Sequence, residues 1–323
     1  AKMKHFALTG VAGYIAPRHL QAIKDTGNTL VAACDPHDSV GILDRYFPDA
    51  AYFNEVERFD RHLDKQRRAG HGIDYLTICA PNNLHDAHIR LALRLGADAI
   101  CEKPLVLNPW NLDALQELEQ ETGRRVYTIL QLRVHPALRE LQQRLRTAAP
   151  RARHDVCLTY ITARGPWYRY SWKGNEQRSG GNATNIGIHF FDLLLWLFGA
   201  VEESTVHLAE PGRMAGILEL AGARVRWFLS VNREDLPPDA VAQGRSTHRA
   251  ISIDGKDLEF TDGFTDLHTR VYEATLAGRG FDIATARPSV ELAYRIRTAA
   301  ATPPPPDAHP FLRGTTADRE VAS

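Results

Sequence analysis

The feature that most constrains the fold of this chain is a regular alternation of short apolar runs and longer amphipathic segments over its first 130 residues. Apolar runs of strand length lie at residues 5–9, 30–34, 75–79, 99–101 and 126–130. Two of the amphipathic segments end at Gly96 and Gly123, where glycine suits a left-handed C-terminal cap. Strand and helix repeated in this order predict a parallel sheet covered by helices on both faces.

From about residue 150 the sequence pattern has a period of two, so that successive side chains fall on opposite sides of a strand. Val225 and Trp227 fall on one side of such a run, and Arg226 and Phe228 on the other, which is typical of a sheet with two different faces. We predict an α/β chain: a doubly wound parallel sheet, then an α+β domain with a mostly antiparallel open sheet. We expect another subunit to pack on the open face. The expected boundaries are 1–130 and 131–301, followed by a proline-rich tail at 302–323.

The balance of charge argues against two classes of partner. With 39 Lys and Arg against 39 Asp and Glu, the chain has no net field to attract nucleic acid or an anionic membrane surface. No apolar stretch approaches the roughly 18 residues of a membrane span, and the N-terminal segment has no secretion signal. We therefore expect a cytoplasmic protein that binds neither nucleic acid nor membrane.

The cysteines predict free thiols. Cys34, Cys79, Cys101 and Cys157 each lie in or at the end of an apolar run. Their spacing matches neither a metal-binding pair nor the density of a secreted disulfide scaffold. We expect buried thiols in a reducing compartment, and no metal site.

A glycine-rich turn follows the first strand and precedes a helical segment. Small residues there let the backbone approach a pyrophosphate at a helix N-terminus. Asp35, which closes the second strand, stands where an acid accepts from a ribose 2′-hydroxyl and repels a 2′-phosphate, so NAD is favoured over NADP. The alternatives are a turn that binds nothing and Asp35 as a turn residue before Pro36. The expected cofactor-binding residues of the turn are Gly10, Ala12, Gly13, Tyr14 and Ile15.

Two further strand ends carry polar loops. Ligands of open parallel sheets bind beyond the carboxyl ends of the strands, so we expect both loops to converge on the nicotinamide. Burial beside a cationic ring would lower the pKa of Lys103 toward that of a useful base, whereas a surface lysine is the alternative. The expected cofactor-binding residues of these loops are Ala80, Pro81, Asn82, His85, Glu102 and Lys103.

These motifs resemble those of a known family, the Gfo/Idh/MocA oxidoreductases, which are NAD(P)-dependent enzymes acting on sugars and cyclitols. The resemblance is carried by residues 10–16, Asp35, residues 80–85, residues 102–104, 131–136 and 179–192. It implies a Rossmann domain followed by an α+β domain, with a homo-oligomer, a tetramer favoured. It also implies that Lys103 and His189 face the hydride-transfer site, and that Gln131 belongs to the cofactor site.

The motif at residues 179–192 also has a physical interpretation that does not depend on the resemblance. Asn185, His189 and Asp192 have the spacing of one helix face, so that Asp192 could orient the His189 imidazole. Many family members carry aspartate where this chain has Asn185. Because an amide accepts no proton, the general base is Lys103 or His189, with Asn185 as a third catalytic residue; His189 as a satisfied interior histidine is the alternative.

A narrower resemblance is to the bacterial members of this family that oxidise C3 of UDP-N-acetylglucosaminuronic acid. That reaction feeds an aminotransferase on the route to diacetamido-uronic acids of lipopolysaccharide O-antigen. Residues 161–168, 171–174, 185–192, 230–237 and 263–268 carry this resemblance.

Such a ligand brings two phosphates and a carboxylate, which basic side chains bind and aromatic rings can flank. A solvated basic loop is the alternative. His268 and Arg233 are weaker candidates, with packing or a subunit contact as the alternative for each. For the whole chain, the alternatives are a dehydrogenase of another sugar or cyclitol and a non-catalytic NAD-binding sensor. The expected substrate-binding residues are Arg164, Tyr168, Trp172, Lys173, Asn182, Thr184, Asn185 and His189.

Overall fold

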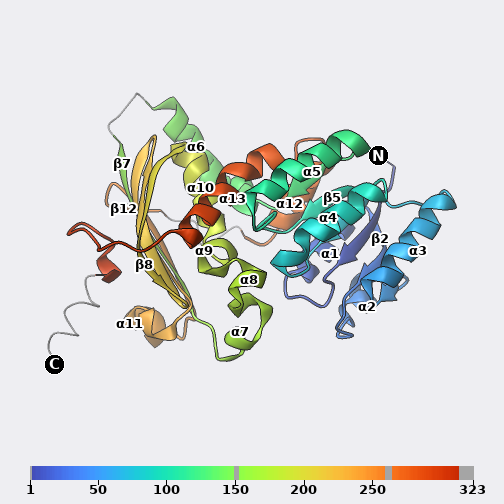
Figure 1. Ribbon diagram of the computed structural model, residues 1–323, viewed down its shortest axis with the longest axis horizontal. Coiled ribbons are helices and arrows are strands. Elements are labelled where there is room, and N and C mark those ends of the chain that lie inside the picture. Colours follow the sequence, from blue (N-terminus) through green and yellow to red (C-terminus); the bar gives the residue numbers. More distant parts are fainter. Residues whose placement is uncertain (1, 149–152, 259–263, 313–323) are drawn as a thin grey trace. The chain divides into compact units, whose positions relative to one another are not determined.

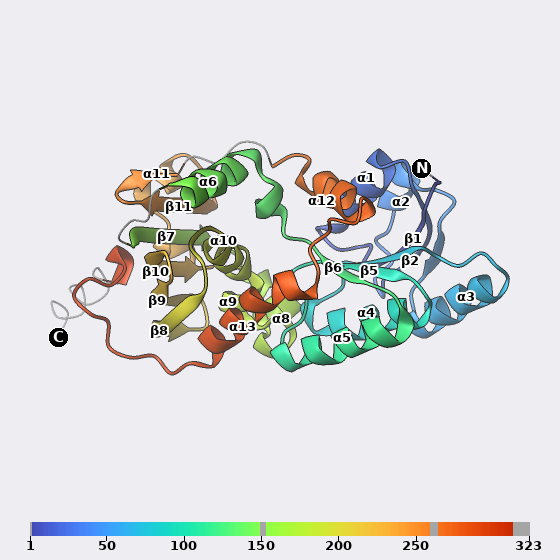
Figure 2. The same cartoon turned by 90° about the horizontal axis from the view of Figure 1, so that it is seen from above.

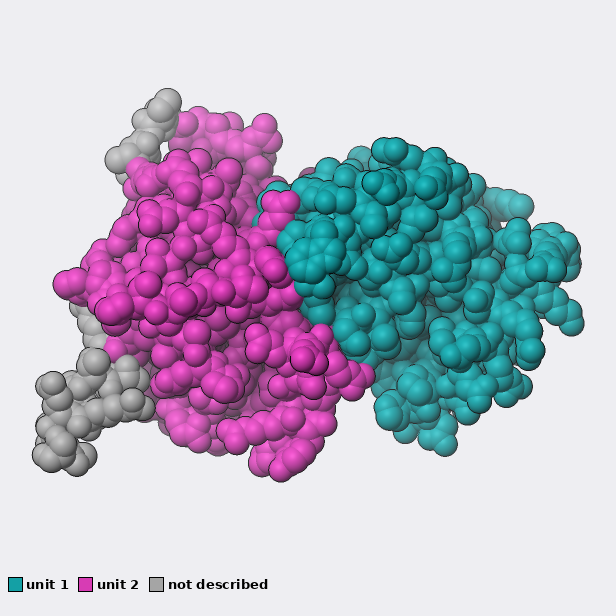
Figure 3. All heavy atoms as spheres, viewed as in Figure 1, with its two compact units in different colours: residues 1–136, 262–290 teal, residues 137–261, 291–323 magenta. Residues whose placement is uncertain are grey.

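The computed structural model of the chain describes residues 2–148, 153–258 and 264–312. The chain divides into two compact units, coloured separately in Figure 3. Unit 1 comprises residues 1–136 and 262–290, and unit 2 comprises residues 137–261 and 291–323. The ranges expected from the sequence are continuous, whereas unit 1 also includes residues 262–290, from late in the chain. The reason is apolar packing, because Val271 and Tyr272 lie in the core of unit 1.

Unit 1 contains a six-stranded sheet in the order β3-β2-β1-β4-β5-β6, in which every neighbouring pair is parallel. This is the doubly wound order, and the predicted fold class is confirmed. The strands are β1 His5–Thr9, β2 Thr29–Cys34, β3 Ala51–Phe53, β4 Tyr75–Ile78, β5 Asp98–Cys101 and β6 Val126–Thr128. The helices are α1 Ala16–Asp25, α2 Ile42–Tyr46, α3 Val56–Arg68, η1 Asn82–Leu84, α4 His85–Arg94, α5 Pro109–Thr122, η2 Gln131–Val134 and α12 Leu267–Leu276.

Helices cover both faces of this sheet. Figure 2 shows α1 and α12 together on one face and α4 and α5 on the other. Gly96 and Gly123 have positive φ angles of 75° and 65°, as expected for glycines that follow helices. The strand order reverses between β1 and β4, and ligands of doubly wound sheets bind at such a reversal.

Unit 2 contains a six-stranded sheet in the order β12-β11-β7-β10-β9-β8. The pair β7 and β10 is parallel and the other pairs are antiparallel, which confirms a mostly antiparallel sheet. The strands are β7 His154–Thr162, β8 Val201–Glu210, β9 Arg213–Leu220, β10 Ala223–Ser230, β11 Thr247–Ile253 and β12 Lys256–Asp257. The helices are α7 Trp167–Tyr170, η3 Trp172–Gly174, α8 Glu176–Ser179, α9 Gly181–Asn185, α10 Ile188–Phe198, η4 Arg233–Asp235 and α11 Pro238–Ala242, while α6 Pro136–Thr147 and α13 Ile283–Thr298 have residues in both units.

The two faces of this sheet are covered by different parts of the chain. Trp227 packs edge-on against Phe191 of α10. Phe228, which points to the opposite face, is 1% exposed because His309 and Phe311 pack on its ring. Figure 1 shows residues 302–312 on the side of the sheet away from α10.

Residues 302–312 therefore pack on the sheet, although their proline content favours a tail without structure. Thr302 donates its backbone N–H to Val206, and Ala308 and Leu312 are buried in an apolar cluster with Phe228. We call residues 302–312 the C-terminal strap. The remainder of the expected tail, residues 313–323, lies outside the described residues. Among the described helices, none has the length and apolar character needed to cross a bilayer.

Candidate active site

The turn after β1 can approach the backbone after β4 closely only because it carries glycine. Gly10 has a φ of +84°, and a Cβ there would lie 2.4 Å from the carbonyl carbon and oxygen of Cys79. Its N–H donates to the carbonyl of Cys34 at the end of β2. The backbone thus approaches the ends of two neighbouring strands, and α1 begins a few residues later, as a dinucleotide pyrophosphate requires. Ile15 precedes α1, and the Tyr14 side chain is 86% exposed.

Asp35 lies at the end of β2 and is almost fully buried. One carboxylate oxygen accepts the backbone N–H of Ala12 in the turn (3.0 Å), and the other accepts that of His37 (2.9 Å). Each oxygen has a second lone pair, so the carboxylate can also accept a ribose hydroxyl. The residues of the turn and Asp35 together fit NAD.

The loops after β4 and β5 are joined by His85. Its Nδ1 lies 2.6 Å from the carbonyl oxygen of Pro104, and its Nε2 lies 2.9 Å from that of Ala80. Burial lowers the pKa of His85, and the two carbonyl contacts oppose that shift. Both ring nitrogens therefore face backbone oxygens of loops that the sequence assigns to the cofactor. Of the other cofactor candidates, Asn82 is buried in η1 and Gln131 begins η2.

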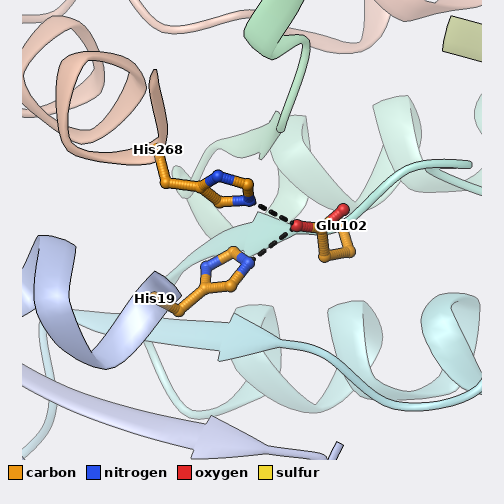
Figure 4. Close-up of side chains that lie close together, drawn as sticks. All are labelled: His19, Glu102 and His268. Atoms are coloured by element: carbon orange, nitrogen blue, oxygen red, sulfur yellow. Dashed lines mark hydrogen bonds and ion pairs between the residues drawn. The ribbon is translucent and has the colours of Figure 1, made fainter. Parts of the chain in front are cut away.

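A buried carboxylate lies at the start of the loop that contains Lys103. Figure 4 shows His19 and His268 pointing toward Glu102. The Nε2 atom of each imidazole lies 2.8 Å from Glu102 Oε1. Glu102 Oε2 accepts the backbone N–H of Lys103 at 3.1 Å. The three side chains come from α1, the end of β5 and α12, which lie far apart in the sequence.

The hydrogen bonds of this cluster continue beyond the imidazoles. His19 Nδ1 lies 2.8 Å from the Tyr272 hydroxyl, which lies 2.9 Å from the Thr77 hydroxyl. Burial alone would raise the pKa of Glu102, but hydrogen bonds and charge from His19 and His268 outweigh it and hold the pKa well below its usual range. Burial lowers the pKa of His19, and Glu102 opposes that shift. Glu102 is therefore an anion among imidazole donors.

Among the described residues, these three side chains also form a group that could hold a metal ion. Each offers one possible ligand atom, and these atoms lie within 4.8 Å of one another. The nitrogen-to-oxygen distances of 2.8 Å are those of hydrogen bonds, and Lys103 and Tyr272 use further donors and acceptors of the cluster. We interpret it as a hydrogen-bonded network. This network was not predicted from the sequence; the signal for it was His19, a polar residue on the buried face of α1 beside Leu20 and Ile23.

In unit 2, the expected helix through residues 185–192 is two helices. Helix α9 ends at Asn185, α10 begins at Ile188, and Gly187 lies in the break. A Cβ at Gly187 would lie 2.6 Å from the Ala183 carbonyl oxygen and 2.7 Å from Leu229, so the close packing of α9 on β10 requires glycine here. The expectation of one continuous helix face for Asn185, His189 and Asp192 is thus wrong.

The structure brings together two of the expected substrate residues. Asn185 Nδ2 donates to the Tyr168 hydroxyl at 3.2 Å, and both side chains are buried. Burial raises the pKa of Tyr168, while the hydrogen bond from Asn185 and the positive charge of Arg164 act to lower it. Nearby in the sequence, Thr184 has a buried hydroxyl without a hydrogen-bond partner among the described residues, and Asn182 donates to the carbonyl of Pro211.

The basic loop carries a half-buried lysine between two indole rings. Lys173 Nζ lies 6.0 Å from the ring centre of Trp167 and 5.8 Å from that of Trp172. Burial lowers the pKa of Lys173, and the positive charge of Arg164 adds to the effect. A cation held near aromatic rings and a second cation can bind an anionic group.

The expected catalytic residues belong to both units. Lys103 lies in unit 1, and Asn185 and His189 lie in unit 2. Their common action on one substrate stays a prediction. Gly263, which opens one of the motifs of the narrower resemblance, lies outside the described residues.

The family models cover most of unit 1 and half of unit 2. Residues 4–130 match the model described as the oxidoreductase family with an NAD-binding Rossmann fold, GFO_IDH_MocA. Residues 155–233 match the model of the C-terminal alpha/beta domain of that oxidoreductase family.

Among solved structures, one dehydrogenase is similar over nearly the full length. The WlbA (WbpB) dehydrogenase of Thermus thermophilus is 54% identical, with a TM-score of 0.92, and the match covers 96% of this chain and 100% of that chain. It has been solved with NAD and alpha-ketoglutarate, and with NAD and UDP-GlcNAcA. The WlbA dehydrogenase of Bordetella pertussis has the same fold. It is 19% identical, with a TM-score of 0.76, and the match covers 95% of this chain and 100% of that chain.

Curated relatives match over shorter regions. D-glucoside 3-dehydrogenase of Escherichia coli (strain K12) is 27% identical over 142 residues, which is 42% of this chain and 39% of that protein. The chain spans between 16% and 39% of the length of the first curated relatives that it matches.

Proposed function

The chain belongs to the Gfo/Idh/MocA oxidoreductase family, and on that premise we propose that it oxidises the C3 hydroxyl of UDP-N-acetylglucosaminuronic acid with NAD, giving the 3-keto sugar nucleotide. The observation that carries this proposal is the full-length similarity to the Thermus dehydrogenase, which binds NAD and that sugar nucleotide. The fold restricts the cofactor more closely than the substrate, so the choice of sugar rests on this similarity.

In the proposed reaction, NAD supplies the acceptor for the hydride that leaves C3. The chain's own residues take the proton of the 3-hydroxyl group as its oxygen becomes the keto oxygen. We assign that proton to Lys103 or His189, each of which has a nitrogen that can accept it. Asn185 positions the sugar, since its amide accepts no proton and the Tyr168 hydroxyl fixes its orientation.

The charges of the substrate match the basic loop of unit 2. We propose that Arg164 and Lys173 bind its phosphates or its carboxylate, because both carry positive charge in one short loop. Trp172 and Tyr168 flank the ligand, and the unpartnered Thr184 hydroxyl is a further donor for it.

We further propose that alpha-ketoglutarate restores the oxidised cofactor. The Thermus dehydrogenase was solved with this keto acid and NAD. The keto acid would take the hydride at its carbonyl carbon and a proton at the carbonyl oxygen, giving 2-hydroxyglutarate.

We also propose a cytoplasmic homotetramer that serves lipopolysaccharide O-antigen synthesis, where an aminotransferase would consume the keto product. Four free cysteines suit a reducing compartment. Exposed residues along β8 leave part of the sheet available to a second subunit. Light scattering tests the assembly, and the mass of a monomer would contradict it.

The experiment that tests the function compares three sugars in the presence of NAD and alpha-ketoglutarate, with mass spectrometry of the products. UDP-N-acetylglucosaminuronic acid should lose two hydrogens. UDP-N-acetylglucosamine lacks the carboxylate and N-acetylglucosaminuronic acid lacks the nucleotide, so both should react far more slowly. Keto product from either of the other two sugars, with none from the first, would make the chain a dehydrogenase of different specificity. NAD binding without turnover of any sugar would favour a sensor.

A further inference from the structure

Both carboxylate oxygens of Glu102 face hydrogen-bond donors. Oε1 faces the Nε2 atoms of His19 and His268, and Oε2 accepts the Lys103 N–H. An ionised carboxylate only accepts hydrogen bonds, so both imidazoles must present Nε2–H to it. A buried anion is tolerated where such donors surround it. The network therefore holds the carboxylate in one orientation.

The bonds around His19 form a chain with one direction. Since His19 Nε2 donates to Glu102, the neutral ring accepts at Nδ1, and the Tyr272 hydroxyl is the donor there. The Thr77 hydroxyl then donates to Tyr272. Each donor is used once and none opposes another, so the chain is fully satisfied in a single arrangement.

The late helix α12 has a clear role in this network. It supplies both His268 and Tyr272, and it packs along α1, which supplies His19. The return of this segment to unit 1 thus brings donors to Glu102 from a distant part of the sequence. Packing alone would be served by apolar side chains at these buried positions.

The loop that begins with Glu102 is held at both ends. Glu102 fixes the backbone N–H of Lys103, and His85 Nδ1 lies 2.6 Å from the carbonyl oxygen of Pro104. His85 is in turn held against the Ala80 carbonyl in the neighbouring loop. The backbone on either side of the lysine side chain therefore has defined partners.

We propose that Glu102 is a positioning residue, which through its bonds to His19, His268 and the Lys103 N–H holds Lys103 for proton transfer. This inference rests on the proposed function, in which Lys103 acts on the 3-hydroxyl group. Glu102 does not itself exchange a proton with the substrate.

The first test is Glu102→Gln, which keeps the shape and removes the charge. Its amide oxygen can face either the imidazoles or the Lys103 N–H, but not both. We expect kcat to fall by about 10²-fold, the scale of a small misplacement of a reacting group, with KM values within about threefold. The Lys103 amide proton resonance should move upfield in apo protein labelled with 15N-lysine. Glu119→Gln is the matched control, because Glu119 also accepts a backbone N–H, that of Val126; it should change neither readout.

A double variant separates positioning from general stability. If Glu102 acts through Lys103, Glu102→Gln should lower the residual rate of Lys103→Ala by less than about twofold. An equal fold-loss in both backgrounds, or a wild-type rate for Glu102→Gln, would overturn the inference while leaving the proposed function intact. Unimpaired turnover by Lys103→Ala would instead overturn the assignment of Lys103, and the inference with it.

A second pair of variants serves if Glu102→Gln folds poorly. His268→Gln keeps a side-chain N–H donor near Glu102, whereas His268→Leu removes it. We expect kcat to fall about tenfold or more in the leucine variant and to be largely restored in the glutamine variant. Equal kcat values for the two variants would contradict positioning by this network.

Discussion

Lys103 and His189 are the two side chains to which we assign the proton of the reacting hydroxyl. Replacement of Lys103 by alanine or of His189 by asparagine should lower kcat by about 10²-fold or more, the usual contribution of an acid–base group. Lys65→Ala and His71→Asn, both at exposed positions, are the matched controls and should retain wild-type turnover. Steady-state kinetics check this, and near-normal kcat in both active-site variants would contradict the assignment.

His309 makes the attachment of the C-terminal strap sensitive to acid. Its Nε2–H donates to Thr159, and its Nδ1 accepts the N–H of Phe311, so a proton on Nδ1 would face another donor. Burial and the charge of Arg226 lower the pKa of His309 to about 4, against an opposing backbone contact. The unfolded chain binds this proton at higher pH than the folded chain does.

Stability from the neutral imidazole is therefore complete above about pH 6.5 and is lost as the pH falls toward 4, by about 3 kcal/mol in total. We expect His309→Asn to lose this part of the pH dependence. Urea unfolding of both proteins across that range measures it. The same slope of unfolding free energy against pH in the variant and the wild type would refute the prediction.

Residues in motifs that follow strands could be proposed for the site from the sequence, whereas residues brought together only by packing could not. Gly10, Asp35 and Lys103 follow strands and could be assigned from position. His19 and Tyr272 could not, because packing of distant segments brings His19 to Glu102 and Tyr272 to His19. His268 was a weaker site candidate, with packing or a subunit contact as the alternative, and its bond to Glu102 was not foreseen.

Among the elements, the turn between β1 and α1 depends most on a single residue. Gly10→Ala would place a methyl group against the Cys79 carbonyl and force a positive φ on alanine. We expect the turn to shift and NAD affinity to fall by about 10²-fold or more. Gly27→Ala is the control, since Gly27 has a similar φ of +73° and open space around its Cβ position. That variant should lose about 1 kcal/mol of stability and bind NAD normally; calorimetric titration distinguishes the two, and equal affinities would contradict the prediction.

The elements themselves were predictable where periodicity was long and regular. The run at residues 5–9 coincides with β1, and Gly123 ends α5 as expected. Strand β3 has three half-buried residues and gives no comparable signal. The break at Gly187 was not foreseen because it depends on the approach of Leu229 from β10, which local sequence does not contain.

For the whole molecule, the strap decides which part of the second sheet stays exposed. Leu312 is buried with Phe228, whereas Pro310, two residues earlier, is exposed. Leu312→Asp should destabilise the fold by about 2–4 kcal/mol and uncover apolar surface on the sheet. Pro310→Asp should do neither. Thermal unfolding and light scattering compare them, and equal melting temperatures with unchanged mass would show that the strap contributes nothing.

Transfer of a labelled hydride tests the proposed dehydrogenation most directly. UDP-N-acetylglucosaminuronic acid carrying deuterium at C3 is incubated with the protein, NAD and alpha-ketoglutarate, and the products are examined by mass spectrometry. We expect the deuterium in 2-hydroxyglutarate and a keto sugar without it, whereas deuterium from substrate labelled at C4 should not appear in 2-hydroxyglutarate. Retention of the C3 label in the sugar product, or transfer of the C4 label, would contradict oxidation at C3.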